Sequence, residues 1–298
     1  MNLKLPSLPD IQHAFTILRL RNISSAFAAA DNCNLFLKCD NTLPACSYKI
    51  RGVEYFANQL KSVETVSVLS AGNLALAAAM RLREDHVNCE AVVPEGISQI
   101  KADKLTEAGA IIKSMPFTEI WRLVQDHSLR QSNTFLHPLN YHLLAGYASV
   151  IIELHQDGFM DGALVIPYGL GGLATAVARA IELTHSNIKL YLCEIDTASP
   201  FTRALQAGKP VFGPRLQSFI EAMGTPEVIT DVFEYLRPRI AGVITVTVDE
   251  AKIEVHRAQQ QYQLRIEGAA AASLAAARKL AKNIRTTALL TGSNISPL

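Results

Sequence analysis

The chain has 298 residues, of which 49% are hydrophobic and 18% are charged. This length is enough for one large or two ordinary domains, and the composition supplies a sizeable core and argues against intrinsic disorder. The 28 lysines and arginines nearly balance the 27 aspartates and glutamates, so we expect neither nucleic acid nor a membrane surface as a partner, because both require a basic surface.

The five cysteines form no Cys-x-x-Cys pair, and their odd number fits no disulfide framework. We therefore expect reduced thiols and a cytoplasmic location. The N-terminus shows no secretory hydrophobic segment. A long uncharged run between Asp161 and Arg179 contains Pro167 and several glycines, which indicates a strand, a loop and a helix rather than a membrane span.

Short aliphatic or β-branched runs alternate with longer helical patterns along the chain. In one of the helical patterns, Ile50, Val53 and Ala57 are spaced so that they share a helix face. The alternation predicts an α/β protein with parallel sheets covered by helices on both faces. The predicted strands are 35–38, 64–69, 89–93, 110–113, 162–167, 188–193, 242–247 and 286–291, and the predicted helices are 50–60, 73–84, 98–108, 117–130, 141–156, 171–184, 249–264 and 268–282.

The first chemically informative segment is Ser-Tyr-Lys-Ile-Arg-Gly, residues 47–52, where a helix is predicted to begin. Lys49 is flanked there by Tyr48 and Ile50. Apolar surroundings near a helix N-terminus disfavour the ammonium form, and a neutral amine is what Schiff-base chemistry with an aldehyde requires. The alternative is an ordinary solvated lysine in a first helical turn. Arg51 is expected to pair with a carboxylate or carbonyl as part of the scaffold.

The next segment is Ser70-Ala71-Gly72-Asn73, which joins a predicted strand to a predicted helix. Polar side chains beside free N–H groups at a helix start form a site for a carboxylate or a ring hydroxyl. The alternative is ordinary N-capping.

A glycine-rich loop, Gly169-Leu170-Gly171-Gly172, follows the predicted strand that ends at Pro167 and opens another helix. Such a loop lets backbone N–H groups converge on a phosphate. Ala174 breaks the G-x-G-x-x-G spacing, and no Lys-Ser/Thr pair follows, so dinucleotide and triphosphate sites are disfavoured. A plain tight turn is the alternative. Together, the lysine, the Ser/Asn turn and this loop favour a covalently bound aldehyde cofactor that carries a phosphate.

From about residue 35 onward the chain resembles the fold-type II pyridoxal-phosphate enzymes, in the branch of threonine and serine dehydratases and serine racemases. Residues 47–53 are similar to the S-F-K-x-R-G-A pattern of that branch, 70–74 to S-x-G-N-H, and 166–173 to V-P-V-G-G-G-G-L. Further similarities lie at 135–138 (F-I-H-P), 145–146 (the A-G of A-G-Q-G-T), 267–270 (E-P-A-G) and 291–294 (S-G-G-N).

The resemblance implies pyridoxal 5′-phosphate as the cofactor. Lys49 would bind its aldehyde and then carry the Cα proton of the substrate, while Tyr48 would lie against the ring and Asn73 would donate to the phenolic oxygen. The phosphate would be bound by Gly169, Leu170, Gly171, Gly172 and Leu173. The substrate would be bound by Ser70, Ala71, Gly72 and Asn73.

Thr291 would meet the pyridine nitrogen, where the family usually has serine. A hydroxyl can donate a hydrogen bond to that nitrogen but does not force its protonation as a carboxylate would. The ring is then a weaker electron sink, which favours prompt loss of a β-leaving group over transamination.

Several positions depart from the family pattern. Ala71 stands where serine racemases have a second serine, so we expect racemase activity to be absent or poor. Leu74, Leu170 and Tyr147 replace a histidine, a glycine and a glutamine. Because Pro200 stands where metal-dependent members have aspartate, we expect no metal site, although Glu194 and the Ala198 carbonyl would remain as ligands.

The sequence therefore predicts a two-domain enzyme, with residues 1–61 and 139–298 in a large cofactor-binding domain and 62–138 in a small mobile domain. The expected reaction is β-elimination of a small hydroxy amino acid, such as L-serine or L-threonine, to a 2-oxo acid and ammonia. Two alternatives remain: a β-replacement synthase of the cysteine-synthase type, and a non-catalytic protein that keeps the cofactor pocket. By family analogy we expect a homodimer.

Overall fold

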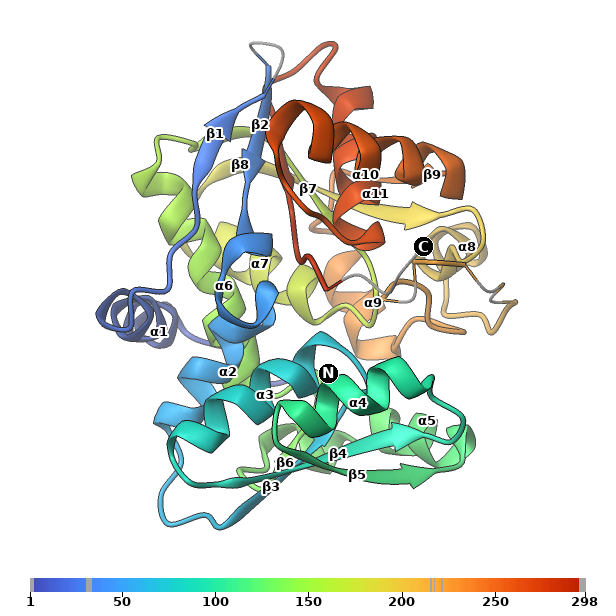
Figure 1. Cartoon of the computed structure of the whole chain (residues 1–298). Helices are drawn as coiled ribbons and strands as arrows, with labels where there is room; N and C mark the ends of the chain where they lie inside the picture. The colour runs from blue at the N-terminus through green and yellow to red at the C-terminus, as the bar shows by residue number, and fades with distance from the viewer. Residues whose placement is uncertain (1–2, 31–33, 215, 217, 221, 295–298) are drawn as a thin grey trace.

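The computed structural model describes residues 3–30, 34–214, 216, 218–220 and 222–294, and these form two sheets covered by helices (Figure 1). The larger sheet is parallel except for its first pair of strands, and the smaller sheet is parallel throughout. In spatial order the larger sheet holds β1 (Phe27–Ala29), β2 (Leu35–Lys38), β10 (Thr286–Leu289), β7 (Asp161–Pro167), β8 (Asn187–Ile195) and β9 (Gly242–Val246). The smaller sheet holds β5 (Ala110–Met115), β4 (Asn88–Pro94), β3 (Thr65–Leu69) and β6 (Phe135–Leu136).

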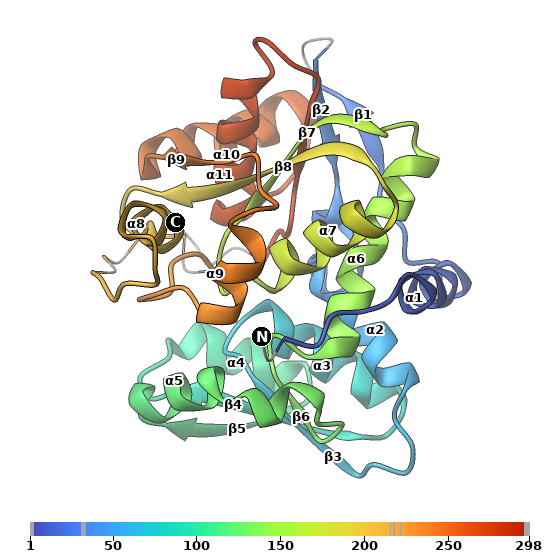
Figure 2. The ribbon, with the colours of Figure 1, turned by 180° about the vertical axis from the view of Figure 1, so that it is seen from behind.

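Helices cover both faces of the larger sheet, as a parallel sheet requires. The α-helices of the described residues are α1 (Leu8–Leu20), α2 (Lys49–Asn58), α3 (Asn73–Glu84), α4 (Gln99–Glu107), α5 (Phe117–Gln125), α6 (Tyr141–Gln156), α7 (Gly172–Leu183), α8 (Pro200–Ala207), α9 (Thr230–Leu236), α10 (Val248–Tyr262) and α11 (Gly268–Leu280). Helices α10 and α11 lie on the face seen in Figure 1, whereas α6 and α7 lie on the opposite face, seen in Figure 2.

Every predicted strand and helix is present, which confirms the α/β fold class. Most predicted boundaries agree with the structure to within two residues, and two of the differences matter for the argument. The last strand ends at Leu289, so Thr291 lies in the following loop. The helix predicted over 117–130 breaks at Asp126, whose side chain accepts from the Ser128 N–H and starts a separate 3-10 helix. Sequence patterns missed the two short strands β1 and β6 and the helices α1, α8 and α9.

All strands of the smaller sheet, together with α3, α4 and α5, fall within residues 62–138. Helix α2 packs against α3 on one side and against α6 on the other, so it connects the two halves of the molecule.

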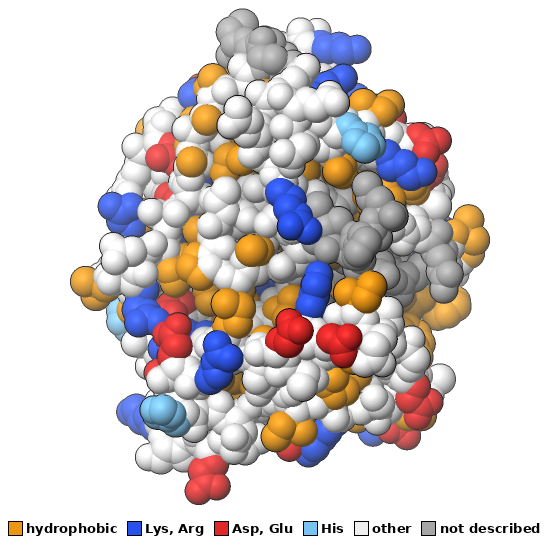
Figure 3. Space-filling view, viewed as in Figure 1, with side chains coloured by type: hydrophobic (Ala, Val, Ile, Leu, Met, Phe, Trp, Pro, Cys, Tyr) orange, Lys and Arg blue, Asp and Glu red, His pale blue; other side chains and the backbone are white. Residues whose placement is uncertain are grey.

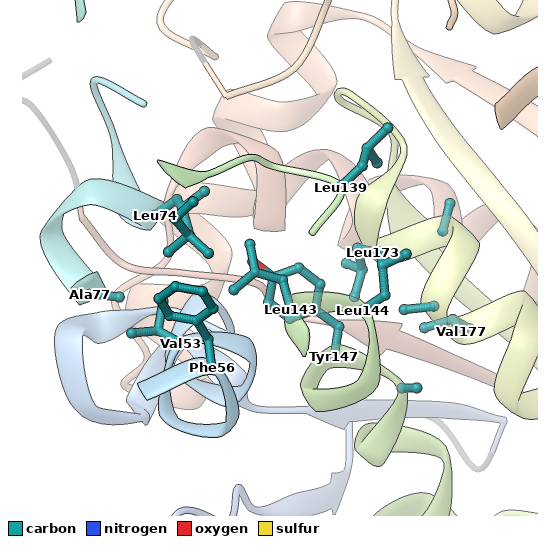
Figure 4. Packing of buried hydrophobic residues seen from close by; sticks show 14 of the residues in the cluster. Val53, Phe56, Leu74, Ala77, Leu139, Leu143, Leu144, Tyr147, Leu173 and Val177 are labelled. Atoms are coloured by element: carbon teal, nitrogen blue, oxygen red, sulfur yellow. The ribbon is translucent and has the colours of Figure 1, made fainter. Parts of the chain in front are cut away.

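The crossing of α2 and α6 depends on two glycines. A Cβ atom at Gly146 would collide with the Arg51 carbonyl oxygen, and a Cβ atom at Gly52 would lie 2.9 Å from the Leu143 Cα. The backbones therefore approach as closely as glycine permits. Figure 4 shows Val53 and Phe56 of α2 facing apolar side chains of α3 and α6 around this crossing.

A buried ion network fixes the first turn of α2. The Arg51 guanidinium donates to Asp40 through Nε (2.7 Å) and to Glu153 through Nη1 (2.6 Å). Lys38 Nζ lies 2.9 Å from the other oxygen of Glu153. The scaffold role expected of Arg51 is therefore confirmed, and the pairing holds Lys49, two residues earlier, in a defined position.

No helix among the described residues combines the length and apolar character that a bilayer span needs. On the face shown in Figure 3, basic and acidic side chains are interspersed rather than segregated. The cysteines in the described ranges, Cys39, Cys46, Cys89 and Cys193, are free thiols, and Cys33 lies outside those ranges.

Candidate active site

A cavity of about 890 Å³ is lined by elements of both sheets and by the starts of several helices. Its volume is typical of sites for small ligands. All residues predicted to bind a cofactor or a substrate line it, although they come from four separate stretches of the chain. These residues are Tyr48, Lys49, Ser70, Ala71, Gly72, Asn73, Gly169, Leu170, Gly171, Gly172, Leu173 and Thr291.

Four helices of the described structure, α2, α3, α7 and α11, begin at this cavity, and none of their N-cap residues caps the helix with its side chain. In α2 the Ser47 Oγ accepts from the first N–H, that of Lys49 (3.3 Å). Side chains cap α1, α6 and α10, which begin elsewhere, but α4, α5, α8 and α9 likewise lack a cap from their N-cap residues. This cavity is distinguished by the convergence of four such helix starts. Uncapped first turns leave N–H donors and partial positive charge for a ligand. The cavity is therefore built for an anion or for several anionic groups.

The glycine-rich loop leads from β7 into α7. Gly171 has φ +98°, and a Cβ atom there would lie 2.5 Å from Val232 Cγ1. A Cβ atom at Gly172 would lie 2.9 Å from the Pro138 carbonyl oxygen. Glycine is thus required by backbone geometry and close packing, and the same absence of side chains leaves the start of α7 open to the cavity.

Ser70 does not cap α3. Its Oγ instead accepts from the Gly72 N–H (3.1 Å), which fixes the turn before the helix. Ala71 and Asn73 also line the cavity. Leu74 also lines the cavity, but it is almost fully buried and packs among the apolar side chains of α2 and α6 (Figure 4). Leucine in place of the family histidine therefore adds an apolar side chain to the core next to the Ser70–Asn73 turn.

Lys49 is the first residue of α2. Its Nζ lies 2.5 Å from the Tyr48 hydroxyl and 5.2 Å from the centre of the Tyr147 ring. Burial lowers the pKa of Lys49 to about 8, against the opposing effect of the Glu267 charge. A far larger fraction of the amine is thus neutral near neutral pH than for an ordinary lysine, and nucleophilic addition to a carbonyl group requires this neutral form.

Tyr147 stands where the family pattern has glutamine, and its ring packs beside Lys49 and Tyr48. The Tyr48 and Tyr147 rings are 5.0 Å apart at an interplanar angle of 59°. Tyr147 is fully buried, and its hydroxyl has no hydrogen-bond partner among the described residues. Its ring, 5.2 Å from Lys49 Nζ, therefore contributes to the burial of the amine.

Glu267 and Asn294 are site residues to which the sequence analysis assigned no role. Asn73 Nδ2 donates to both Glu267 oxygens (2.9 and 3.1 Å), and Asn73 Oδ1 accepts from Asn294 Nδ2 (2.9 Å). Burial raises the pKa of Glu267 to about 7, although Asn73 and Lys49 act in the opposite direction. The residues lie about two hundred positions from Asn73, so only their similarity to family segments marked them in the sequence.

Thr291 follows β10 and is almost fully buried at the cavity wall. Its carbonyl oxygen accepts from the Tyr48 N–H (3.0 Å), which ties it to the start of α2. The Thr291 hydroxyl has no partner among the described residues. Because leaving a buried hydroxyl unpaired is unfavourable, this group points to a ligand atom that completes its hydrogen bonding.

The carboxylate of Glu194, a possible metal ligand in the sequence, accepts hydrogen bonds from the first turn of α8. It accepts from the N–H groups of Phe201 (2.6 Å) and Thr202 (2.9 Å) and from the Thr202 hydroxyl (2.7 Å). Burial raises the pKa of this carboxyl group. No cluster of metal-ligating side chains occurs among the described residues, and Ala198 lies in the adjoining turn.

A family model described as "Pyridoxal-phosphate dependent enzyme" matches residues 16–292. The serine dehydratase-like protein of Mus musculus is 30% identical over 251 residues, which cover 81% of this chain and 76% of that protein. The biosynthetic L-threonine dehydratase of Pasteurella multocida is 26% identical over 273 residues, which cover 88% of this chain and 53% of that protein, so the chain spans about half of its length. Maize serine racemase shares the fold, with a TM-score of 0.84 at 19% identity over 98% of this chain and 95% of that one.

Proposed function

The chain belongs to the family of pyridoxal-phosphate dependent enzymes, and we propose that it catalyses β-elimination of a small hydroxy amino acid, such as L-serine or L-threonine, to a 2-oxo acid and ammonia. The observation that carries this proposal is the buried, unpartnered hydroxyl of Thr291 in the cavity that holds Lys49. A neutral hydroxyl opposite the ring nitrogen favours loss of a β-substituent over transamination.

The residues present fit the cofactor. Lys49 supplies an amine whose pKa is lowered, and the open start of α7 supplies N–H donors for the phosphate. Thr291 supplies the missing partner for a ring nitrogen, and Asn73 supplies an amide for the phenolic oxygen. In such enzymes the bound cofactor supplies an aldehyde for the substrate amine and a ring that accepts electrons from Cα.

The protein contributes binding and proton transfer. The uncapped start of α3, with Ser70, Ala71, Gly72 and Asn73, binds the substrate carboxylate. Lys49 would take the Cα proton of the bound substrate, and the β-hydroxyl would leave with a proton as water. Hydrolysis of the released enamine would then give the 2-oxo acid and ammonia. Tyr147 and Tyr48 exclude water around the amine and keep it ready for that transfer.

Residues 62–138 would form a mobile domain that closes over the ligand, against the large domain of residues 1–61 and 139–298. Closure would bring the Ser70–Asn73 loop toward Lys49. By analogy with the family, the enzyme would be a cytoplasmic homodimer, which light scattering of the purified protein tests directly.

Product analysis tests the reaction. Holoenzyme incubated with L-serine and L-threonine should release ammonia and the matching 2-oxo acid, and Lys49→Ala should release neither. With sulfide and an activated serine, formation of cysteine in place of pyruvate would instead support a β-replacement synthase. No turnover across a panel of amino acids, despite cofactor binding, would support the non-catalytic alternative that the departures at Leu74, Leu170 and Tyr147 keep open.

A further inference from the structure

Glu267 is the only acidic residue among the described residues that line the cavity. Its carboxylate is held tightly, because a Cβ atom at Gly292 would lie 2.6 Å from Oε1. The Glu267 N–H also donates to the Gly292 carbonyl oxygen (2.9 Å). The side chain therefore has a fixed position at the start of α11, facing the start of α3.

The hydrogen bonds from Glu267 determine how Asn73 presents its amide. Both Glu267 oxygens accept from Asn73 Nδ2, and Asn294 Nδ2 donates to Asn73 Oδ1. Asn294 is itself fixed, because the same Nδ2 donates to the Ala45 carbonyl oxygen (2.9 Å). A flip of the Asn73 amide would place donor against donor and oxygen against carboxylate.

We propose that Glu267 is a positioning residue that orients Asn73 toward the phenolic oxygen of the cofactor and that also places a negative charge in the cavity lined by Lys49. The proposal rests on the proposed function only in requiring the cofactor in this cavity, and it does not depend on the substrate.

The charged groups around Glu267 determine in which direction its carboxylate shifts the pKa of Lys49. Among the described residues, Lys49 and Tyr48 interact electrostatically with Glu267, while Asn73 and Asn294 are neutral. Burial keeps Tyr48 protonated by raising its pKa. Burial lowers the pKa of Lys49 and the Glu267 carboxylate raises it, so removing that negative charge must favour the neutral amine further.

Two lysines on another element belong to the same electrostatic environment. Lys101 and Lys104 of α4 also line the cavity. Their positive charges favour the ionised form of any carboxyl group nearby. They are present in every variant considered below, so they do not contribute to a difference between wild type and variant.

The titration of Lys49 tests the electrostatic part in the cofactor-free protein. The rate at which a trace acylating reagent modifies Lys49 is measured against pH by mass spectrometry of the Lys49 peptide. In Glu267→Gln the midpoint should fall by about half a pH unit or more. Glu95→Gln removes an exposed carboxylate next in sequence to Pro94, which lines the cavity, and should leave the midpoint unchanged. An unchanged midpoint in Glu267→Gln, with a wild-type circular dichroism spectrum, overturns this part.

A double-mutant cycle on cofactor affinity, measured at a pH above the Lys49 midpoint of every variant so that the amine is neutral in all of them, tests the positioning part. If Glu267 acts through Asn73, the double variant Asn73→Ala/Glu267→Gln should bind the cofactor no more weakly than Asn73→Ala alone. Losses that multiply would show that the residues act independently and would overturn the proposal. Glu267→Asp separates the roles, because it keeps the charge and shortens the arm. It should retain the Lys49 midpoint and lose affinity. Neither measurement requires turnover, so both can be interpreted even if the protein has no β-elimination activity.

Discussion

Lys49 Nζ and the Tyr48 hydroxyl oxygen, on adjacent residues at the start of α2, lie 2.5 Å apart. The family branch usually has phenylalanine at this position, so the hydroxyl is a feature of this chain. Burial raises the pKa of Tyr48, and the hydroxyl therefore stays protonated and able both to donate to the amine and to accept from the ammonium.

Tyr48→Phe should consequently keep the cofactor site and lose one hydrogen bond. We expect cofactor affinity to fall less than about tenfold, since one such bond contributes about 1 kcal/mol. Tyr48→Ala should weaken binding more, because it also removes the ring that packs on Tyr147. Titration of the visible absorption band of the lysine-bound cofactor gives both constants. Equal losses in the two variants would mean that the ring has no role.

The pH dependence of cofactor attachment should report the Lys49 pKa. The neutral amine is the nucleophile, so the rate should rise with pH and level off above about pH 8, where burial places this pKa. Stopped-flow absorbance on the cofactor-free protein measures the rate. A midpoint at the ordinary lysine value of 10.5 would show that Lys49 is solvated.

The sequence predicted the elements that carry a strong local signal. Residues 73–84 and 141–156 form helices with the predicted boundaries, because each combines a polar residue at its start with a continuous helical pattern. Strand β6 has only two residues and exists because β3 pairs with it, so nothing local marks it. The short helix α8 likewise depends on Glu194, six residues upstream of its first residue.

In the site, too, features with a local sequence signal were predicted and long-range contacts were not. Three parts of the site stand at helix starts: Lys49, the Ser70–Asn73 turn and the glycine loop. Helix starts can be predicted from the turn residues that precede them. The Asn73–Glu267 pair and the contact of Tyr147 with Lys49 arise only when α3, α6 and α11 meet. The family resemblance identified the segments that contain Asn73, Glu267 and Tyr147. The spacing of residues along the chain does not predict the contacts between these segments.

Arg51→Met should destabilise the protein strongly. The substitution leaves Asp40 buried without its cation and leaves Glu153 paired with Lys38 alone, and removal of one partner from a buried ion pair typically costs ~3–5 kcal/mol. Burial raises the pKa of Glu153, but the charges of Arg51 and Lys38 outweigh burial and hold this pKa below its usual value. The stabilisation is therefore present above the ordinary carboxyl pKa and is lost as the pH falls through the lowered one.

Urea denaturation at pH 7 and at pH 4 measures this effect, and the deficit of Arg51→Met should shrink on acidification. Lys252→Met removes an exposed ion pair with Asp249 and should change the stability by less than about 1 kcal/mol at either pH. A deficit in Arg51→Met as small as that of Lys252→Met would show that the network is dispensable.

Gly146→Ala should loosen the crossing that holds Lys49. The new Cβ atom would meet the Arg51 carbonyl oxygen and the Gly52 Cα, neither of which can move without shifting α2. Overpacking of this kind costs ~1–3 kcal/mol. Gly72→Ala is the matched control, since a Cβ atom there meets nothing within 4 Å. Thermal unfolding of the cofactor-free proteins should show a lower midpoint for Gly146→Ala alone.

Ala71 lines the cavity where racemases of the family place a serine, and it has no group able to protonate Cα on the side opposite Lys49. We therefore expect the wild type to convert L-serine to pyruvate without accumulating D-serine. Ala71→Ser adds one hydroxyl at a partly buried position. It should give measurable D-serine by chiral chromatography, at a rate well below elimination, because Leu74 and Tyr147 still depart from the racemase pattern. Ala71→Gly, which adds no hydroxyl, is the control. Interconversion of D- and L-serine by the wild type would show that another group already protonates that face.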